Sequence, residues 1–328
     1  MMNRINYIDR MKGLAILVVV LAHVYLFAFG MGNSAVFRFC TSFEMPLFMF
    51  VSGFVAYISG NSGGANYRKL GKRIVSYVCP AFVVSYGTAA YDYLILGNGN
   101  IDIVETLTGG LWYLKALAIF VCLQCMLTTC KKFWQELLAV GMAEAAFLIG
   151  WKTSPFLHQL FCLEHCFFFY PFFMMGYYMR RYRLMEIIKS KNWLFTVSLI
   201  GFACLLNANI EIHALRFLSE RVLRPAFAII AISYLFCIRE DKSSMLERWL
   251  NRIGTKTLDI YMYHCLFLSG TFMIFDLQSL KNSEVMNSNP TIYFLIALII
   301  TIFLSYVSIA IGYLVRGSDF LRKIIYGK

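Results

Sequence analysis

The stretch LAILVVVLAHVYLFAF, Leu14–Phe29, decides the fold class of this chain. Apart from His23, every residue in it is aliphatic or aromatic. A bilayer core about 30 Å thick is crossed by a helix of about 20 such residues. With its neighbours, over 12–30, the stretch therefore predicts a membrane-spanning helix.

The same kind of apolar run recurs along the whole chain. Of the 328 residues 59% are hydrophobic and only 15% are charged, against about a quarter charged in soluble domains. The runs are continuous, whereas strands of a membrane barrel alternate. We therefore expect an all-α polytopic bundle of about ten transmembrane helices in a single domain, 1–328. The expected spans are 12–30, 43–60, 74–96, 111–130, 133–150, 164–181, 192–210, 221–238, 254–276 and 290–316.

The basic residues set the orientation. Most of the 30 Lys and Arg side chains fall in alternate loops, and basic loops stay cytoplasmic. Both termini are then cytoplasmic, as an even number of spans requires. The net charge is +12, but apolar runs separate the basic residues from one another. This pattern indicates membrane orientation rather than nucleic-acid binding. We expect a multi-pass protein of the cytoplasmic membrane whose first span is retained, not cleaved as a signal peptide.

Ionisable side chains inside the spans are the functional candidates, because they are costly there. His23 lies near the centre of the first span, and Lys12 lies eleven residues earlier. Eleven residues make about three helical turns and a rise of about 16 Å, so both share one helix face. Lys12 then lies at the cytoplasmic headgroups. The alternative for His23 is a core histidine bonded to a neighbouring helix.

A second histidine, His264, is expected at a similar depth in the ninth span. Thr257, Tyr261 and His264 follow helical spacing and share one polar face. Two histidines at one depth predict a common central cavity. A neutral imidazole there can act as a general base, or as part of a proton path in a transporter.

Two further groups of polar residues begin the second and third spans. Arg68, Lys69, Lys72 and Arg73 gather at the cytoplasmic start of the third span. These side chains could bind the phosphates of a cytosolic ligand. Alternatively, they set the orientation of the span in the membrane and contact anionic lipid. In the second span Glu44 suits a helix start, and Ser52 permits a polar helix contact.

The ten cysteines form no disulfide framework, since most lie within apolar spans and there act as small hydrophobes. Cys122 and Cys125 make a C-x-x-C pair, and Cys162 and Cys166 flank His165. Metal or redox chemistry is one reading of these residues, and helix packing is the other. Because no second ligand pair stands at zinc-site spacing, we expect no metal.

Five segments, in order, resemble the acyltransferase family 3 membrane proteins. The first is Ile8–Ile16 followed by His23, which carries the family's basic residue, ten spacers and His. MPLFMFVSGF resembles the proline-bearing second helix, and Leu111–Leu114 resembles the Leu-Trp-aromatic-Leu element. Pro171–Gly176 resembles the PxFxxG-like element, and Ile253 to His264 resembles the late element that ends in Tyr-x-x-His. The short form is most similar to the branch of fucose and other surface-glycan O-acetyltransferases.

This resemblance implies transfer of an acyl group, usually acetyl, from cytosolic acyl-CoA to a hydroxyl of a glycan or lipid-linked sugar. It implies that His23 is the general base and that Lys12, at the cytoplasmic end of the same helix, is the basic residue paired with it. Tyr261, His264 and Trp112 are the candidate hydrogen-bond donors to the oxyanion. The donor phosphates would bind Arg10, Lys12, Arg68, Lys69, Lys72 and Arg73, and Glu44, Ser52 and Trp112 would face the acceptor.

The sequence departs from the family in two places. Lys69 and Lys72 stand where the family often has an Arg-x-x-Arg pair, so the charge remains without bidentate geometry. Asp259 stands where a small residue is usual, and its role is open. Two other classes also suit the composition: a secondary transporter, whose expected inverted repeats are not evident, and a non-catalytic membrane assembly protein. The pair of Lys12 and His23 favours an enzyme.

Overall fold

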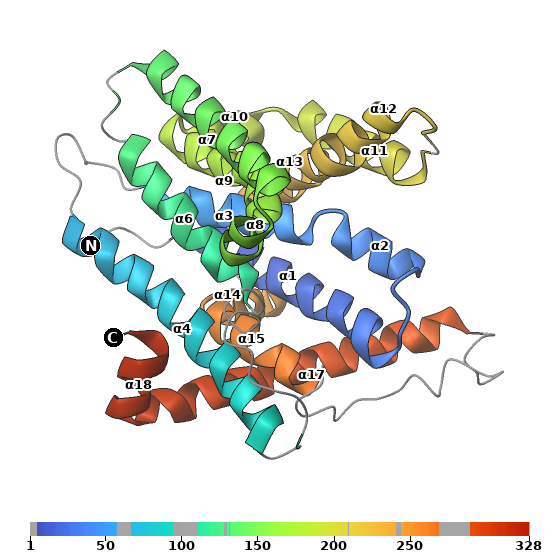
Figure 1. The fold of residues 1–328 in the computed structure, drawn as a ribbon. Coiled ribbons are helices and arrows are strands. Elements are labelled where there is room, and N and C mark those ends of the chain that lie inside the picture. Colours follow the sequence, from blue (N-terminus) through green and yellow to red (C-terminus); the bar gives the residue numbers. More distant parts are fainter. Residues whose placement is uncertain are drawn as a thin grey trace. The chain divides into compact units, whose positions relative to one another are not determined.

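A computed structural model describes residues 5–57, 67–94, 97, 111–127, 130, 132–208, 210–240, 244–268 and 289–327, with the backbone alone at 67–70 and 92. Within these ranges all regular secondary structure is helical, as the sequence predicts (Figure 1). The chain divides into two compact units, one of Met1–Phe54 with Met175–Gly312 and the other of Val55–Met174 with Tyr313–Lys328. The single domain expected from the sequence stays a prediction.

The first unit contains both histidine-bearing segments. Its helices are α1 (Asn6–His23), η1 (Val24–Ala28), α2 (Ala35–Thr41), α3 (Glu44–Ala56), α10 (Leu184–Ser190), α11 (Asn192–Asn207), α12 (His213–Leu218), η2 (Ser219–Leu223), α13 (Arg224–Cys237), α14 (Met245–Gly254), α15 (Thr257–Tyr263), η3 (His264–Phe267) and most of α17 (Pro290–Gly317). The second unit contains α4 (Tyr67–Leu94), α6 (Trp112–Leu127), α7 (Phe133–Thr153), α8 (Pro155–Phe161), much of α9 (Leu163–Arg181) and α18 (Asp319–Tyr326).

The core of the first unit forms around α1, which packs against α2, α13, α14 and α15. Figure 1 shows α1 and α14 next to each other. Glycines make this contact close: a Cβ on Gly13 would meet the Leu250 carbonyl, and one on Gly254 would meet the Asp9 carbonyl. Small residues let two helix backbones approach in this way. The pair of glycines therefore fixes α1 against the element that leads into His264.

The start of α14 is fastened by a polar network. Ser244 caps the helix, and its backbone N–H donates to Glu247 Oε2 at 2.8 Å. Arg239 Nε donates to Glu247 Oε1 at 2.9 Å. Arg10 donates to the Arg239 carbonyl at 2.7 Å, and its Nη1 lies 3.7 Å from Glu247 Oε1. The Ser244 N–H, followed by the two arginines, holds the pKa of the Glu247 carboxyl below its usual range.

Helix length and composition support a membrane protein. Five helical segments of the described chain are long and apolar enough to cross a bilayer, and a sixth arises if the bent pair α8 and α9 counts as one span. The five are Asn6–Ala28, Ala35–Ala56, Gly71–Tyr91, Phe133–Thr153 and Pro290–Gly317. On α7 the large side chains of Trp134, Leu138 and Ile149 are exposed. Such an apolar surface suits lipid rather than water.

Four of the ten expected spans differ from a continuous long helix. The runs 111–130 and 192–210 form the shorter apolar helices α6 and α11, and 221–238 is divided between η2 and α13. Over 254–276 the described part ends at 268, and Lys256 leaves helical geometry between α14 and α15. With only seven residues, α15 rises about 10 Å and cannot cross the bilayer alone. The count of ten spans and the cytoplasmic termini stay predictions.

Candidate active site

His23 lies where α1 changes its geometry. It is the last residue of α1, and the next five residues form the π-helical turn η1. Such turns are rare and occur often at functional sites, because they re-aim side chains. His23 is part-buried and its ring lies 5.6 Å from that of Phe27, centroid to centroid.

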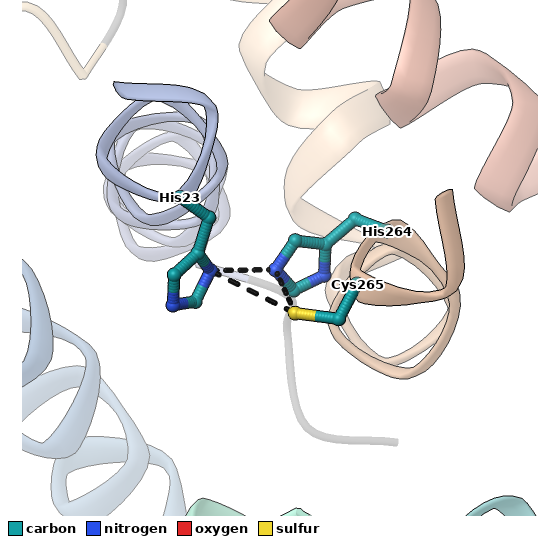
Figure 2. Close-up of side chains that lie close together, drawn as sticks. All are labelled: His23, His264 and Cys265. Atoms are coloured by element: carbon teal, nitrogen blue, oxygen red, sulfur yellow. Dashed lines mark hydrogen bonds between the residues drawn. The ribbon is translucent and has the colours of Figure 1, made fainter. Parts of the chain in front are cut away.

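The structure brings His23 and His264 together, from elements that are 241 residues apart. His23 Nδ1 lies 2.9 Å from His264 Nε2, and the ring planes differ by only 22° (Figure 2). His264 is fully buried and begins the 3₁₀ turn η3, directly after α15. The sequence predicted a similar depth for the two histidines, and the structure places their rings in direct contact.

The hydrogen bonds fix the tautomers of a neutral pair. His264 Nδ1 lies 2.7 Å from the Ile260 carbonyl oxygen, which only accepts, so this nitrogen carries the proton and donates. His264 Nε2 then accepts from His23 Nδ1–H. His23 Nε2 is left with its lone pair, on the part of the ring turned away from His264 (Figure 2). The arrangement therefore orients an imidazole nitrogen that is chemically able to accept a proton.

A third side chain, Cys265, joins the two histidines. Its Sγ lies 3.2 Å from His264 Nε2 and 3.9 Å from His23 Nδ1 (Figure 2). Sequence reasoning missed this residue, although it follows His264 directly. The His–Cys dipeptide was a signal, but helical spacing places neighbouring residues on different faces. In the structure the Cys265 Sγ nevertheless lies close to both imidazoles.

Three other predicted site residues, Tyr261, Lys12 and Arg10, belong to the first unit. Tyr261 is buried, with its ring centroid 6.3 Å from that of His264. Lys12 is part-exposed and its Nζ lies 3.4 Å from Asp9 Oδ1. Arg10 is buried in the α14 network rather than facing solvent. A donor-binding role for Arg10 would require that network to open.

The predicted acceptor residues of α3 make local contacts. Glu44 is buried in the first turn of α3. Ser52 donates its hydroxyl to the Phe48 carbonyl at 2.8 Å, one turn earlier on the same helix. Asp259 is buried, and a Cβ on Gly312 of α17 would contact its carboxyl group. The roles of Glu44 and Ser52 in acceptor binding stay predictions, and the role of Asp259 stays open.

The remaining predicted residues belong to the second unit. Arg68, Lys69, Lys72 and Arg73 all lie on the first turns of α4; Lys72 is exposed and Arg73 is half-buried. Trp112 begins α6, and its ring packs on His165 at 4.2 Å and on Phe169 at 5.3 Å between centroids. Within the described residues Cys122, Cys125, Cys162 and Cys166 form no disulfide, and both readings of these cysteines, metal or redox chemistry and helix packing, stay predictions. In the described chain the one cluster with metal-ligand spacing is His23, His264 and Cys265.

Comparison with known protein families gives the class of this protein. The family model described as "Acyltransferase domain" matches residues 5–310. The chain belongs to this family and is a membrane acyltransferase. It is also similar to the Nodulation protein NolL of Mesorhizobium japonicum, with 23% identity across 99% of this chain and 91% of the relative. No solved structure matches the chain.

Proposed function

We propose that this protein is an O-acyltransferase of the cytoplasmic membrane that moves an acyl group, most simply acetyl, from cytosolic acyl-CoA to a hydroxyl of a cell-surface or lipid-linked glycan. The observation that carries the proposal is the hydrogen-bonded pair of His23 and His264. The pair leaves His23 Nε2 free to accept a proton. Membership of the acyltransferase family supplies the reaction class.

The transfer step follows from this lone pair. His23 Nε2 accepts the proton of the acceptor hydroxyl as its oxygen attacks the thioester carbonyl carbon. The tetrahedral intermediate collapses with cleavage of the C–S bond, and the CoA sulfur leaves with the proton from His23. The imidazolium formed between these events stays hydrogen-bonded to His264 Nε2 through its Nδ1–H. A positioned base of this kind accelerates transfer by about 10²–10⁴-fold.

Donor binding is proposed at the cytoplasmic end of α1. Lys12 lies eleven residues before His23 on the same helix, a rise of about 16 Å. A pantetheine arm has a comparable reach, so phosphates held near Lys12 would place the thioester by His23. Lys69, Lys72, Arg73 and Arg68 would supply further positive charge. Tyr261 is the proposed hydrogen-bond donor to the oxyanion, while Trp112, Glu44 and Ser52 would contact the acceptor.

Hydrolysis of radiolabelled acetyl-CoA by detergent-purified protein, without acceptor, tests the proposal. Water replaces the acceptor hydroxyl, so the wild type should hydrolyse the thioester slowly. His23→Ala should lower the rate by about 10²-fold or more while acetyl-CoA still binds. His213→Ala, which removes an exposed histidine of α12, is the matched control and should keep the wild-type rate. Equal rates in wild type and His23→Ala would refute the base.

A further inference from the structure

We propose that His23, His264 and Cys265 form a binding site for a zinc-class cation, and that its occupation inhibits acyl transfer. All three ligand atoms lie within 4.8 Å of one another and converge on one point (Figure 2). Imidazole nitrogen with thiolate sulfur is the ligand set that Zn²⁺ and its neighbours prefer over Mg²⁺ or Ca²⁺. The cluster should therefore prefer Zn²⁺ and similar cations to Mg²⁺ and Ca²⁺.

The separations suit one tetrahedral ion. With Zn–N near 2.0–2.1 Å and Zn–S near 2.3 Å, ligand atoms lie about 3.3 Å apart for two nitrogens and about 3.6 Å for nitrogen and sulfur. The structure has 2.9 Å between the nitrogens, and 3.2 and 3.9 Å from sulfur to each nitrogen. Each differs by about half an ångström or less, so small side-chain rotations complete the site.

His264 already has the outer contact typical of a metal ligand. Its Nδ1–H donates to the Ile260 carbonyl at 2.7 Å, which directs the Nε2 lone pair toward the centre of the cluster. Metal-bound histidines almost always donate their other N–H in this way. His23 and Cys265 are only part-buried, so an ion can reach the cluster. Three protein ligands leave a fourth position for water.

Metal binding and base catalysis exclude each other at His23. An ion takes the Nδ1 lone pair, so the Nδ1 proton moves to Nε2 through solvent. The Cys265 thiol becomes a thiolate and releases one proton, so one proton leaves per ion bound. His23 Nε2 then carries hydrogen and cannot accept the acceptor's proton. This inhibition rests on the proposed function, whereas binding of the ion does not.

Cobalt(II) titration of the purified full-length protein tests the site without an acyl-transfer assay. One Co²⁺ per chain should give a thiolate-to-cobalt absorption band in the near ultraviolet together with visible bands of tetrahedral Co²⁺. Cys265→Ser should abolish the thiolate band and weaken binding by about 100-fold or more, as loss of an inner ligand exceeds an outer-contact loss. Cys204→Ser, which removes an exposed thiol of α11, should leave both unchanged. A thiolate band that survives Cys265→Ser, or no band in the wild type, would overturn the site.

Zinc inhibition of acetyl-CoA hydrolysis tests the consequence. Stoichiometric Zn²⁺ should stop the wild type, and a chelator should restore its rate. Measured against its own metal-free rate, Cys265→Ser should need about 100-fold more Zn²⁺ for half inhibition. Full activity with Zn²⁺ bound would overturn inhibition. Cobalt bands in a protein that hydrolyses no acyl-CoA would support the metal site and contradict the proposed function. Failure of the metal site can therefore be distinguished from failure of the proposed function.

Discussion

At the scale of single residues, His23 and His264 differ in how their ring nitrogens are engaged, although both are imidazoles. His264 is fully buried between the Ile260 carbonyl and His23. It contacts His23, the proposed base, and offers no lone pair to a substrate, because both of its ring nitrogens are engaged. We therefore assign it as a positioning residue that selects the tautomer of His23, with Tyr261 packed beside it.

Substitutions at His264 separate positioning from packing. Gln offers a side-chain carbonyl that can accept from His23 Nδ1–H, whereas Leu fills similar space and cannot. His264→Leu should lower kcat by about 10²–10⁴-fold with little change in KM. His264→Gln should restore at least part of that loss. Steady-state kinetics of the two variants would contradict the assignment if Leu were as active as Gln.

Glu247 gives the chain a predictable response to acid. Its pKa is held below the ordinary 4.5, so the folded state favours the carboxylate. This contribution to stability is complete above pH 4.5 and disappears as the pH falls through the lowered folded-state pKa. Glu247→Gln should lower the melting temperature at neutral pH, and the difference from wild type should shrink below pH 4.5.

Thermal unfolding in detergent across this pH range measures the effect. Glu211→Gln, at an exposed position outside the helices, is the control and should melt like the wild type at every pH. A Glu247→Gln difference that stays constant through acidification would show that the ionised carboxylate is not the stabilising group.

At the scale of elements, the contact of α1 with α14 positions the histidines. Gly13 and Gly254 each lie against a backbone carbonyl of the other helix, and the network of Arg10 and Glu247 fastens the start of α14. The chain then continues from α14 through α15 to His264. A change at this contact is therefore transmitted to the distance between the imidazoles.

Gly254→Ala should disturb both stability and activity. The added methyl would meet the Asp9 carbonyl, and overpacking of this kind costs about 1–3 kcal/mol. The melting temperature and acetyl-CoA hydrolysis should both fall. Gly141→Ala on α7, where nothing lies within 4 Å, should be neutral or stabilising because Ala favours helix by up to about 1 kcal/mol. Equal behaviour of the two variants would refute the close contact.

At the scale of the whole molecule, charge asymmetry and hydropathy describe how the chain crosses the membrane. The described helices include five segments that are long and apolar enough to cross a bilayer, or six if the bent pair counts as one. The whole chain has a mean hydropathy of +0.65, as expected of a protein that lies largely within a bilayer. The expected ten spans and cytoplasmic termini give a topology that reporter fusions can test.

Fusions on either side of α17 test this orientation directly. The positive-inside rule places the basic C-terminal segment, with Arg322 and Lys323, in the cytoplasm. A fluorescent protein after Lys328 should fluoresce and alkaline phosphatase there should be inactive. After Asn289, which precedes α17, the activities should reverse. The same activities at both positions would contradict a span over α17.

The sequence alone predicted a helical membrane protein and singled out His23 and His264 as candidates for chemistry. Long apolar runs have few alternatives in a bilayer, since every backbone polar group must be satisfied within the helix. The histidines were identifiable because an ionisable group within such a run is costly. Local pattern is sufficient for both conclusions.

Only the tertiary structure decided how these residues meet. The π turn after His23, the 3₁₀ turn at His264 and the break at Lys256 arise where helices pack against one another, and no periodicity in the sequence encodes them. The hydrogen bond between the histidines and the approach of Cys265 are likewise contacts between separate helices, or between neighbours on different faces, and only the tertiary structure shows them. Arg10 likewise became part of an ion-pair network because α14 lies beside it. Contacts between residues more than 200 positions apart depend on packing of whole helices, which spacing along one helix cannot specify.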